Sequence, residues 1–254
     1  MIFRVLVLIM VLPVGLWAVN PLWRGNASTK KIALTFDDGP KPEYAVPLLD
    51  VLKKLGVHAT FFVVGKEAKL NPDIIQRMEL EGHEVGSHSY THPPLDSLNA
   101  KDLEFEISET NRVLQSITGK PVKYFRPPGG RYTLNVMQTI ENHGLKIVMW
   151  TVNAEDYTVF SATLNVHGES RESRSNQKLY EKISSKAKGG SIVLMHNGSK
   201  ETIETLPRII SSLRENGYHL VTISEMLEDA PRTHKSLWIG TRRVFSRGNA
   251  TEST

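Results

Sequence analysis

The stretch KIALTFDDGP, residues 31–40, holds a strand candidate that breaks directly into a turn. Residues 32–36 are apolar enough for a buried strand, and Asp37 and Asp38 follow it ahead of a Gly-Pro pair. Adjacent carboxylates repel each other, so the pair needs either water or a cation. A solvated Asp-Gly turn would satisfy it as well as a metal or acid-base site would. The rest of the chain has to decide between these two interpretations.

Short apolar runs alternate with helical patterns from residue 31 onward, which is typical of βα units around a parallel sheet. We expect strands at 32–36, 59–64, 84–87, 122–125, 146–152, 191–195 and 219–221. Helices are expected at 44–55, 72–81 (capped by Asn71), 100–118 (capped by Asn99), 133–143, 177–187, 202–216 and 224–227. The fold class is therefore α/β, a distorted or incomplete (β/α) barrel with about seven βα units; a doubly wound sheet is the alternative.

The composition is that of an ordinary globular domain. The chain has 254 residues, 40% hydrophobic and 23% charged, which is enough to bury a large core in one domain. Its net charge of +4 lacks the clustered basic stripe of a nucleic-acid binder, so we expect no nucleic-acid partner. Cysteine is absent, which excludes disulfides and thiolate metal sites. A transition metal would have to be held by His, Asp or Glu.

The N-terminal segment predicts export. Residues 5–19 form an uncharged apolar run of signal-sequence length, behind a short positive start. We assign residues 1–27 to a signal sequence or membrane anchor and place the protein outside the cytoplasmic membrane; an apolar helix packed on the domain is the alternative. The main domain then covers residues 28–230, with an insertion loop at 158–176, and residues 231–254 form a basic tail.

Polar side chains gather where the predicted strands end. Parallel βα architectures collect these ends on one rim, and active sites lie there. In strand order the residues are Asp37 and Asp38, then His88 and His92, Arg126, Glu155 and Asp156, and His196. This convergence favours a functional site over a solvated turn.

The segment HSYTH contains His88 and His92 at an HxxxH spacing. On a helix this spacing puts both imidazoles on one face, but Pro93 and Pro94 prevent a helix here, so we expect a turn. Two histidines with one aspartate leave open positions on a metal ion, which is the arrangement of a hydrolytic zinc site.

Two further segments bear on catalysis. RPPGGRY, residues 126–132, is a rigid loop whose glycines leave backbone N–H groups for an oxyanion, and we assign Gly129 and Pro128 to oxyanion and substrate contacts. LMHNG, residues 194–198, places His196 at a strand end, as expected of a general acid or base. The alternatives are an ordinary Pro-Gly turn with Arg126 as a surface arginine, and a structural, hydrogen-bonding histidine at 196.

Taken together, TFDDGP, HSYTH, RPPGG, NAEDY and LMHNG resemble the five motifs of the polysaccharide deacetylases, carbohydrate esterase family 4 with its NodB homology domain. The resemblance covers about residues 30–228 and makes residues 28–230 a deacetylase domain. It implies these roles: Asp37 as catalytic base, Arg126 as the arginine that orients it, His196 as general acid tuned by Asp156, and Asp38, His88 and His92 as metal ligands.

The resemblance implies metal-dependent removal of N-acetyl groups from N-acetylglucosamine-type residues of an extracytoplasmic glycan, with peptidoglycan as the first choice. The cofactor would be one divalent metal ion, zinc before cobalt, nickel or manganese, and the chain would act as a monomer. Chitin-type oligomers and exopolysaccharide are alternative substrates. A non-catalytic glycan-binding relative is the other alternative, because the chain departs from the family pattern in the fourth and fifth motifs, at Asn153, Tyr157 and Asn197. It also departs at Gly129–Gly130, which leaves the backbone donor in place.

Overall fold

The computed structural model describes residues 20–156 and 171–228, and for residues 171–174 the backbone alone. The strands are β1 (Lys31–Asp37), β2 (Thr60–Val63), β3 (Glu84–Ser87), β4 (Tyr124–Phe125), β5 (Lys146–Ile147), β6 (Val152–Asn153), β7 (Ile192–His196) and β8 (His219–Val221). The α-helices are α1 (Pro42–Leu55), α2 (Gly65–Leu70), α3 (Pro72–Leu80), α4 (Ala100–Thr118), α5 (Leu134–Asn142), α6 (Arg171–Lys186), α7 (Lys200–Glu215) and α8 (Ile223–Leu227).

The described strands form one parallel sheet in the order β5-β4-β3-β2-β1-β7-β6, with β8 beside the start of β1. β5 and β6 are consecutive in the chain yet lie at opposite edges, so residues 148–151 connect the two edges. A sheet that curls until the chain bridges its edges is a distorted, incomplete barrel. The predicted fold class is therefore confirmed.

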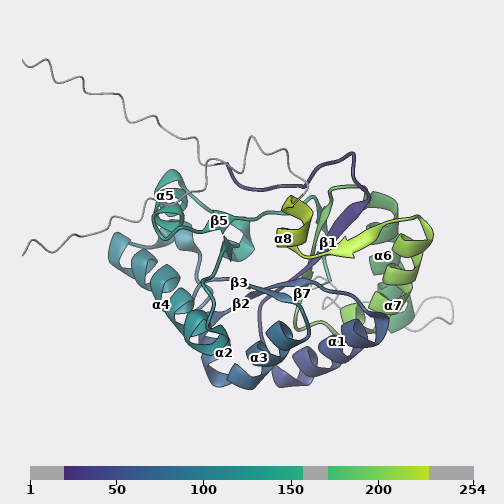
Figure 1. Cartoon of the computed structure of the whole chain (residues 1–254), viewed down its shortest axis with the longest axis horizontal. Helices are drawn as coiled ribbons and strands as arrows, with labels where there is room; N and C mark the ends of the chain where they lie inside the picture. The colour runs from purple at the N-terminus through teal and green to yellow at the C-terminus, as the bar shows by residue number, and fades with distance from the viewer. Residues whose placement is uncertain (1–19, 157–170, 229–254) are drawn as a thin grey trace, which may run out of the picture.

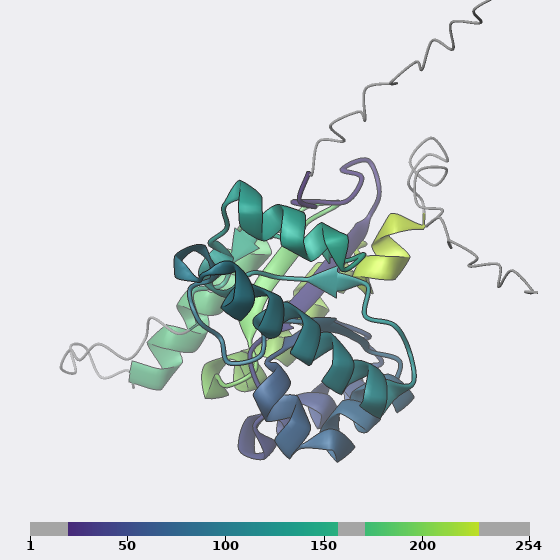
Figure 2. The same ribbon diagram turned by 90° about the vertical axis from the view of Figure 1, so that its left-hand side faces the viewer.

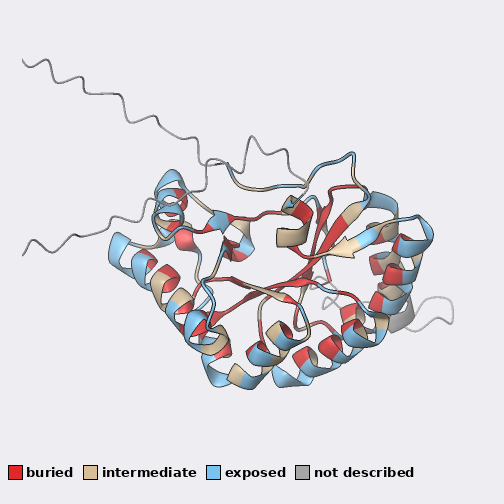
Figure 3. Cartoon of the chain, viewed as in Figure 1, coloured by how far each residue is buried: buried red, intermediate tan, exposed pale blue. Residues whose placement is uncertain are grey.

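Helices form a layer around the outside of the curl. Neighbouring helices contact one another in the order α5, α4, α3, α1, α7, α6, with α2 against α3 and α4. Figures 1 and 2 show this layer wrapped around the sheet. In Figure 3 the inward faces of the helices and most of the central strands are buried. Amphipathic helices cover a parallel sheet in this way because its strands must be shielded from water on both faces.

Strand β1 lies near the middle of this sheet. Its last six residues are buried, and it pairs with β2 on one side and β7 on the other. A parallel strand buried on both faces needs an almost continuous apolar run, which the sequence IALTF supplies. The hydroxyl of Thr35 donates a hydrogen bond to Val193 O at 2.7 Å. The register with β7 sets Asp37 beside His196, at the ends of both strands.

The prediction of one strand at 146–152 is wrong, because two short strands occupy this stretch. β5 pairs with β4 and β6 pairs with β7. Between them, the carbonyl oxygens of Val148 and Met149 each accept a hydrogen bond of 3.1 Å from the Arg126 guanidinium. Leu22, from the N-terminal segment, forms an isolated bridge to Val148. Backbone groups that are satisfied by a side chain and by a distant segment do not continue a sheet ladder.

The expected insertion loop at 158–176 is wrong over its last six residues, because α6 begins at Arg171. The sequence RESRSN at 171–176 carries no apolar period, so nothing in it predicts a helix. Residues 157–170 of the expected loop lie outside the described residues.

Asn71 precedes α3 but does not cap it through its side chain. Its Nδ2 donates instead to Pro40 O and Glu67 O, both at 3.0 Å. These bonds tie the turn after β1 to the end of α2, a short helix that the sequence analysis missed. Asn71 therefore supports the loop beside Asp38 rather than the helix that follows it.

Residues 20–27 lie against the domain, along the upper edge of Figure 1 near α8. The Gly25 N–H donates to Gly190 O at 2.8 Å, and the Arg24 guanidinium donates to Gly189 O at 3.3 Å. The apolar run at 5–19 and the basic tail at 231–254 lie outside the described residues. Within residues 20–156 and 171–228, no helix is long and apolar enough to cross a bilayer. The export segment therefore stays a prediction.

Candidate active site

The residues expected from the strand ends meet on one rim of the barrel. Asp37 is the last residue of β1, and His196 is the last residue of β7. His88 follows β3 and Arg126 follows β4. The short loops after these strands carry the remaining candidates, including Asp156 after β6.

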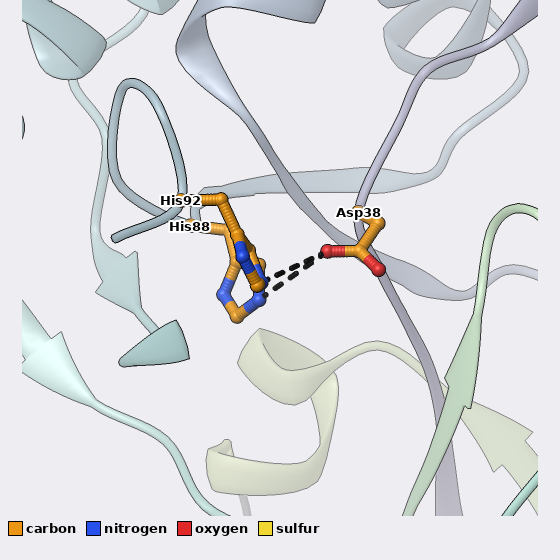
Figure 4. Close-up of side chains that lie close together, drawn as sticks. All are labelled: Asp38, His88 and His92. Carbon is orange, nitrogen blue, oxygen red and sulfur yellow. Dashed lines mark ion pairs between the residues drawn. The ribbon is translucent and has the colours of Figure 1, made fainter. Parts of the chain in front are cut away.

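Asp38, His88 and His92 form a cluster with the chemistry of a metal site. One potential ligand atom from each lies within 4.8 Å of the others. Asp38 Oδ1 is 3.3 Å from His92 Nε2 and 3.7 Å from His88 Nε2, and Figure 4 shows both rings turned toward this carboxylate. Ligand atoms that share one zinc ion in tetrahedral geometry lie about 3.3 Å apart, so the cluster fits such an ion with little adjustment.

The backbone around this cluster explains why a turn replaces a helix. Asp38, Ser89 and His92 all have positive φ angles, of 70°, 64° and 64°. Left-handed residues of this kind cannot continue a helix, so the chain turns sharply at these positions. The turn expected at HSYTH is therefore confirmed.

The buried ring of His88 has a defined tautomer. Its Nδ1 lies 2.7 Å from the carbonyl oxygen of Arg126, which can only accept, so Nδ1 carries the proton and Nε2 keeps its lone pair. Burial lowers the pKa of His88, although the charges of Asp37 and Asp38 oppose this, and the ring is neutral near pH 7. A neutral imidazole with a fixed Nδ1–H is the form that binds a metal.

Asp37 stands beside the cluster and is held by Arg126. Arg126 Nη1 donates to Asp37 Oδ1 at 2.6 Å, and Asp37 Oδ2 is 3.7 Å from His88 Nε2. One oxygen of the carboxylate is thus fixed by the guanidinium and the other faces the candidate metal site. The two adjacent aspartates of the DD pair therefore have different surroundings.

Arg126 is fully buried, and every part of its guanidinium is engaged. Besides Asp37, it donates to Thr35 Oγ1 at 2.8 Å and to the two carbonyl oxygens between β5 and β6. Its guanidinium also lies 4.1 Å from the centre of the Phe62 ring. Burial lowers the pKa of Arg126 and Asp37 opposes this, but an arginine remains charged in any case. The interpretation of Arg126 as a surface arginine is wrong.

His196 is backed by Asp156. His196 Nδ1 lies 2.6 Å from Asp156 Oδ1, while Asp156 Oδ2 accepts from the His196 N–H at 2.9 Å and from the Thr202 hydroxyl at 2.6 Å. Burial lowers the pKa of His196, but the hydrogen bond and charge of Asp156, with the charges of Asp37 and Asp38, outweigh it. The net effect raises the pKa, so the ring can carry a proton at neutral pH.

The loop after β4 leaves one glycine N–H as a candidate oxyanion donor. Pro128 is buried, and Gly129 is exposed with a φ of 61°. The Gly130 N–H donates to Pro127 O at 2.9 Å, so it is used within the turn. A Cβ on Gly130 would lie 2.6 Å from Trp150, whereas one on Gly129 would meet only Arg131 at 4.0 Å. Open space at Gly129 leaves room for a ligand, and its role stays a prediction.

Sequence reasoning missed two residues that support the site. Glu106, buried on α4, accepts from the backbone N–H groups of Tyr90 and Thr91 at 2.7 and 2.8 Å and so holds the turn between the two histidines. Thr202, in the first turn of α7, holds Asp156. A signal for Glu106 does exist, because it shares the inward helical stripe of Leu103 and Ile107.

Glu155 is the one strand-end candidate that the structure directs elsewhere. It forms an ion pair with Lys182 of α6, and its φ of 56° lets the chain turn toward Asp156.

A polar rim with a clustered Asp-His-His set, on an incomplete (β/α) barrel, is typical of metal-dependent hydrolases.

Comparison with known proteins gives the family. The family description of polysaccharide deacetylases matches residues 24–148. Over 209 residues the chain is 33% identical to the peptidoglycan-N-acetylmuramic acid deacetylase PdaA of Bacillus subtilis, covering 82% of this chain and 75% of that protein. The chain belongs to the polysaccharide deacetylase family, carbohydrate esterase family 4. This confirms the resemblance drawn from the five motifs.

Two other relatives show the range within the family. The peptidoglycan-N-acetylglucosamine deacetylase PgdA of Listeria monocytogenes is 36% identical over 199 residues, which are 78% of this chain but only 39% of that longer protein. A crystal structure of a CE4 family pseudoenzyme from Bacillus anthracis has a TM-score of 0.74 and 30% identity, covering 83% of this chain and 70% of that one. A mutant described as having restored enzymatic activity has the same TM-score. The fold alone therefore does not decide whether a member is active.

Proposed function

We propose that this protein hydrolyses the N-acetyl groups of N-acetylglucosamine-type residues in an extracytoplasmic glycan, and that the glycan is peptidoglycan. The main support for this proposal is that the two adjacent aspartates have different surroundings. Asp38 lies against two histidines, whereas Asp37 accepts a hydrogen bond from Arg126. The names of PdaA and PgdA support peptidoglycan as the glycan, and the name of PgdA supports N-acetylglucosamine as the sugar. Both are peptidoglycan deacetylases, and a wall substrate agrees with the predicted export segment.

Asp38, His88 and His92 would hold one divalent metal ion, zinc as first choice. Such an ion, when bound, polarises the acetyl carbonyl and lowers the pKa of water. Asp37 then accepts the proton of the attacking water through Oδ2, the oxygen that Arg126 Nη1 does not bind. Arg126 fixes the direction of this carboxylate, so little reorganisation is needed when the proton arrives.

The departing amine needs a proton, and His196 is placed to give it. Asp156 accepts from His196 Nδ1–H, so the Nε2 side of the ring is available to hold the transferable proton. The Gly129 N–H donates to the developing oxyanion. The C–N bond breaks as His196 Nε2 gives its proton to nitrogen, and the products are acetate and a free amine on the sugar.

A non-catalytic glycan-binding protein is the second candidate, because the Bacillus anthracis neighbour is called a pseudoenzyme. In this chain, however, a base, an acid and a metal cluster stand together on one rim. This arrangement favours turnover over binding alone.

The test is acetate release from peptidoglycan and from N-acetylglucosamine oligomers, by metal-stripped and zinc-reconstituted protein. Asp37→Asn should lower kcat by about a hundredfold or more while zinc stays bound, because it removes the base and no ligand. His92→Ala should lose zinc and activity together. Asp73→Asn, an exposed change on α3, is the control.

Asp37→Asn also leaves a buried guanidinium without its anion, which costs about 3–5 kcal/mol of stability. Thermal unfolding of each variant therefore accompanies the assay. A folded, zinc-loaded wild-type protein that releases no acetate from either glycan would overturn the proposed activity.

A further inference from the structure

A cavity of about 370 Å³ opens beside the candidate metal ligands, within the size range of small-ligand sites. Asp38 and His92 form part of its wall, and the rest comes from α1, α2 and the loops after β1, β2, β3 and β7. The cavity is thus adjacent to the candidate metal site, where the acetamido group would react. The proposed mechanism uses none of its other residues.

Two exposed lysines, Lys41 and Lys66, line the cavity. Lys41 precedes α1 and Lys66 lies in the first turn of α2, and both are exposed. Neither ammonium group has an ion-pair or hydrogen-bond partner within the described ranges 20–156 and 171–228. The wall also holds the carboxylates of Glu67 and Asp38, and Asp38 lies against the two histidines rather than against a lysine. The two ammonium groups therefore remain available to an anionic ligand.

The cavity is also lined by a polar group that the protein leaves unsatisfied. Asn197 is 1% exposed, and neither its Oδ1 nor its Nδ2 has a hydrogen-bond partner among the described residues. A buried amide without partners costs about 1–3 kcal/mol. A Cβ at position 39 would lie 2.8 Å from this Nδ2, so Gly39 leaves the amide its space. A ligand with hydroxyl and carboxylate oxygens can satisfy such a site.

Resting on the proposed function, we infer that this cavity is a subsite for a carboxylate-bearing sugar, with Lys41 and Lys66 as the residues that recognise its charge. In peptidoglycan that carboxylate belongs to the lactyl group of a muramic acid whose stem peptide has been removed, because the peptide is attached to this group as an amide. Chitin-type oligomers offer no such group. The lysine pair thus selects acidic glycans over neutral ones of the same length.

The experiment compares one glycan with its neutralised form. A muramic-acid-containing tetrasaccharide without stem peptides is offered as the free acid and as the methyl ester, and kcat/KM is measured for both. In the double variant Lys41→Glu and Lys66→Glu, the acid-to-ester ratio should fall about tenfold, mainly through KM. Added salt should lower the ratio in the wild type, because exposed charges are screened.

Lys54→Glu is the matched control. It is the same change on an exposed lysine at the other end of α1, about 20 Å along the helix from Lys41, and it should leave the ratio unchanged. An acid-to-ester ratio near one in the wild type, or one that the double variant does not lower, overturns the subsite.

A binding measurement tests the subsite independently of the proposed hydrolytic activity. Affinities of the same acid and ester for the Asp37→Asn protein are measured by calorimetry. If no glycan is deacetylated but the acid still binds more tightly through the lysines, the proposed reaction fails and the subsite stands. Equal affinities for acid and ester overturn the subsite, whatever the activity.

Discussion

At the scale of single residues, the site depends on charged groups that are buried in pairs. Arg126 is fully buried, and Asp37 is the anion that compensates its charge. His196 stands in the same relation to Asp156. Removing one partner of such a pair leaves the other charge uncompensated in a medium of low dielectric constant. Each pair therefore both orients its two side chains and sets their protonation states. A substitution in either pair should change both properties.

The Asp156→Asn variant should lower the pKa of His196, because it removes the charge that raises this pKa and weakens the hydrogen bond to Nδ1. A general acid works only while protonated, so the alkaline limb of the kcat/KM profile should move to lower pH, and the maximum rate should fall about tenfold to a hundredfold. The measurement is a pH-rate profile of the zinc-loaded protein. Thr202→Val, which removes one bond to Asp156, should shift the limb less. An unmoved limb would show that Asp156 does not tune the acid.

At the scale of elements, helix α4 supports the site through the Glu106 side chain. Glu106 Oε1 accepts from the Thr91 hydroxyl at 2.5 Å, and Oε2 accepts from the two N–H groups of the HSYTH turn. The turn has left-handed residues at both ends, which are unfavourable without outside support. A carboxylate that bonds to successive N–H groups provides this support, so the helix fixes the spacing of the two histidines.

Glu106→Gln should therefore weaken metal binding without touching a ligand. The amide oxygen can replace Oε2, but without the negative charge its bonds to the two N–H groups are weaker. The NH₂ group faces the Thr91 hydroxyl, which can no longer donate as it does to Oε1, and the turn should loosen. We expect zinc affinity to fall about tenfold, as for other residues that orient ligands. Competition with a chromogenic chelator measures this. Glu109→Gln, on the same helix but paired with Arg112 away from the turn, is the control. Equal affinities for both variants would contradict the supporting role.

At the scale of the whole molecule, the two ends of the barrel use histidine differently. His88, at the carboxyl end of β3, faces the site, whereas His83 lies just before the amino end of the same strand. His83 is buried, and its Nδ1 accepts from the Ala59 N–H at 3.2 Å. Burial, with the charge of His58, lowers the pKa of His83 to about 4. This histidine is therefore a neutral part of the core.

The depressed pKa of His83 links stability to pH. The unfolded chain takes up the proton near pH 6.5 and the folded chain only near 4, so the free energy of unfolding should fall as the pH drops through this window. The loss approaches about 3 kcal/mol by pH 4, at about 1.4 kcal/mol per pH unit. Urea unfolding at several pH values checks it. His83→Gln should have a shallower slope between pH 6.5 and 4, and an unchanged slope would contradict the assignment.

The sequence by itself determined the alternation of strands and helices, the family, and the residues that gather on one rim. These are local properties: apolar periodicity reports which face is buried, and parallel strands place their carboxyl ends together. The five motifs predicted the position of the site for the same reason, since each motif lies at a strand end. The sequence also predicted different roles for Asp37 and Asp38, although only through the resemblance to the family.

Only the tertiary structure decided which groups hold these residues in place. Arg126 reaches Asp37 from 89 residues away and Thr202 reaches Asp156 from 46. The same arginine draws in the carbonyls of residues 148 and 149, which divides a predicted strand in two. The cavity lined by Lys41, Lys66 and Asn197 likewise brings together the loop after β1, helix α2 and the loop after β7. Such contacts depend on the register and curl of the whole sheet, and no local pattern carries that information.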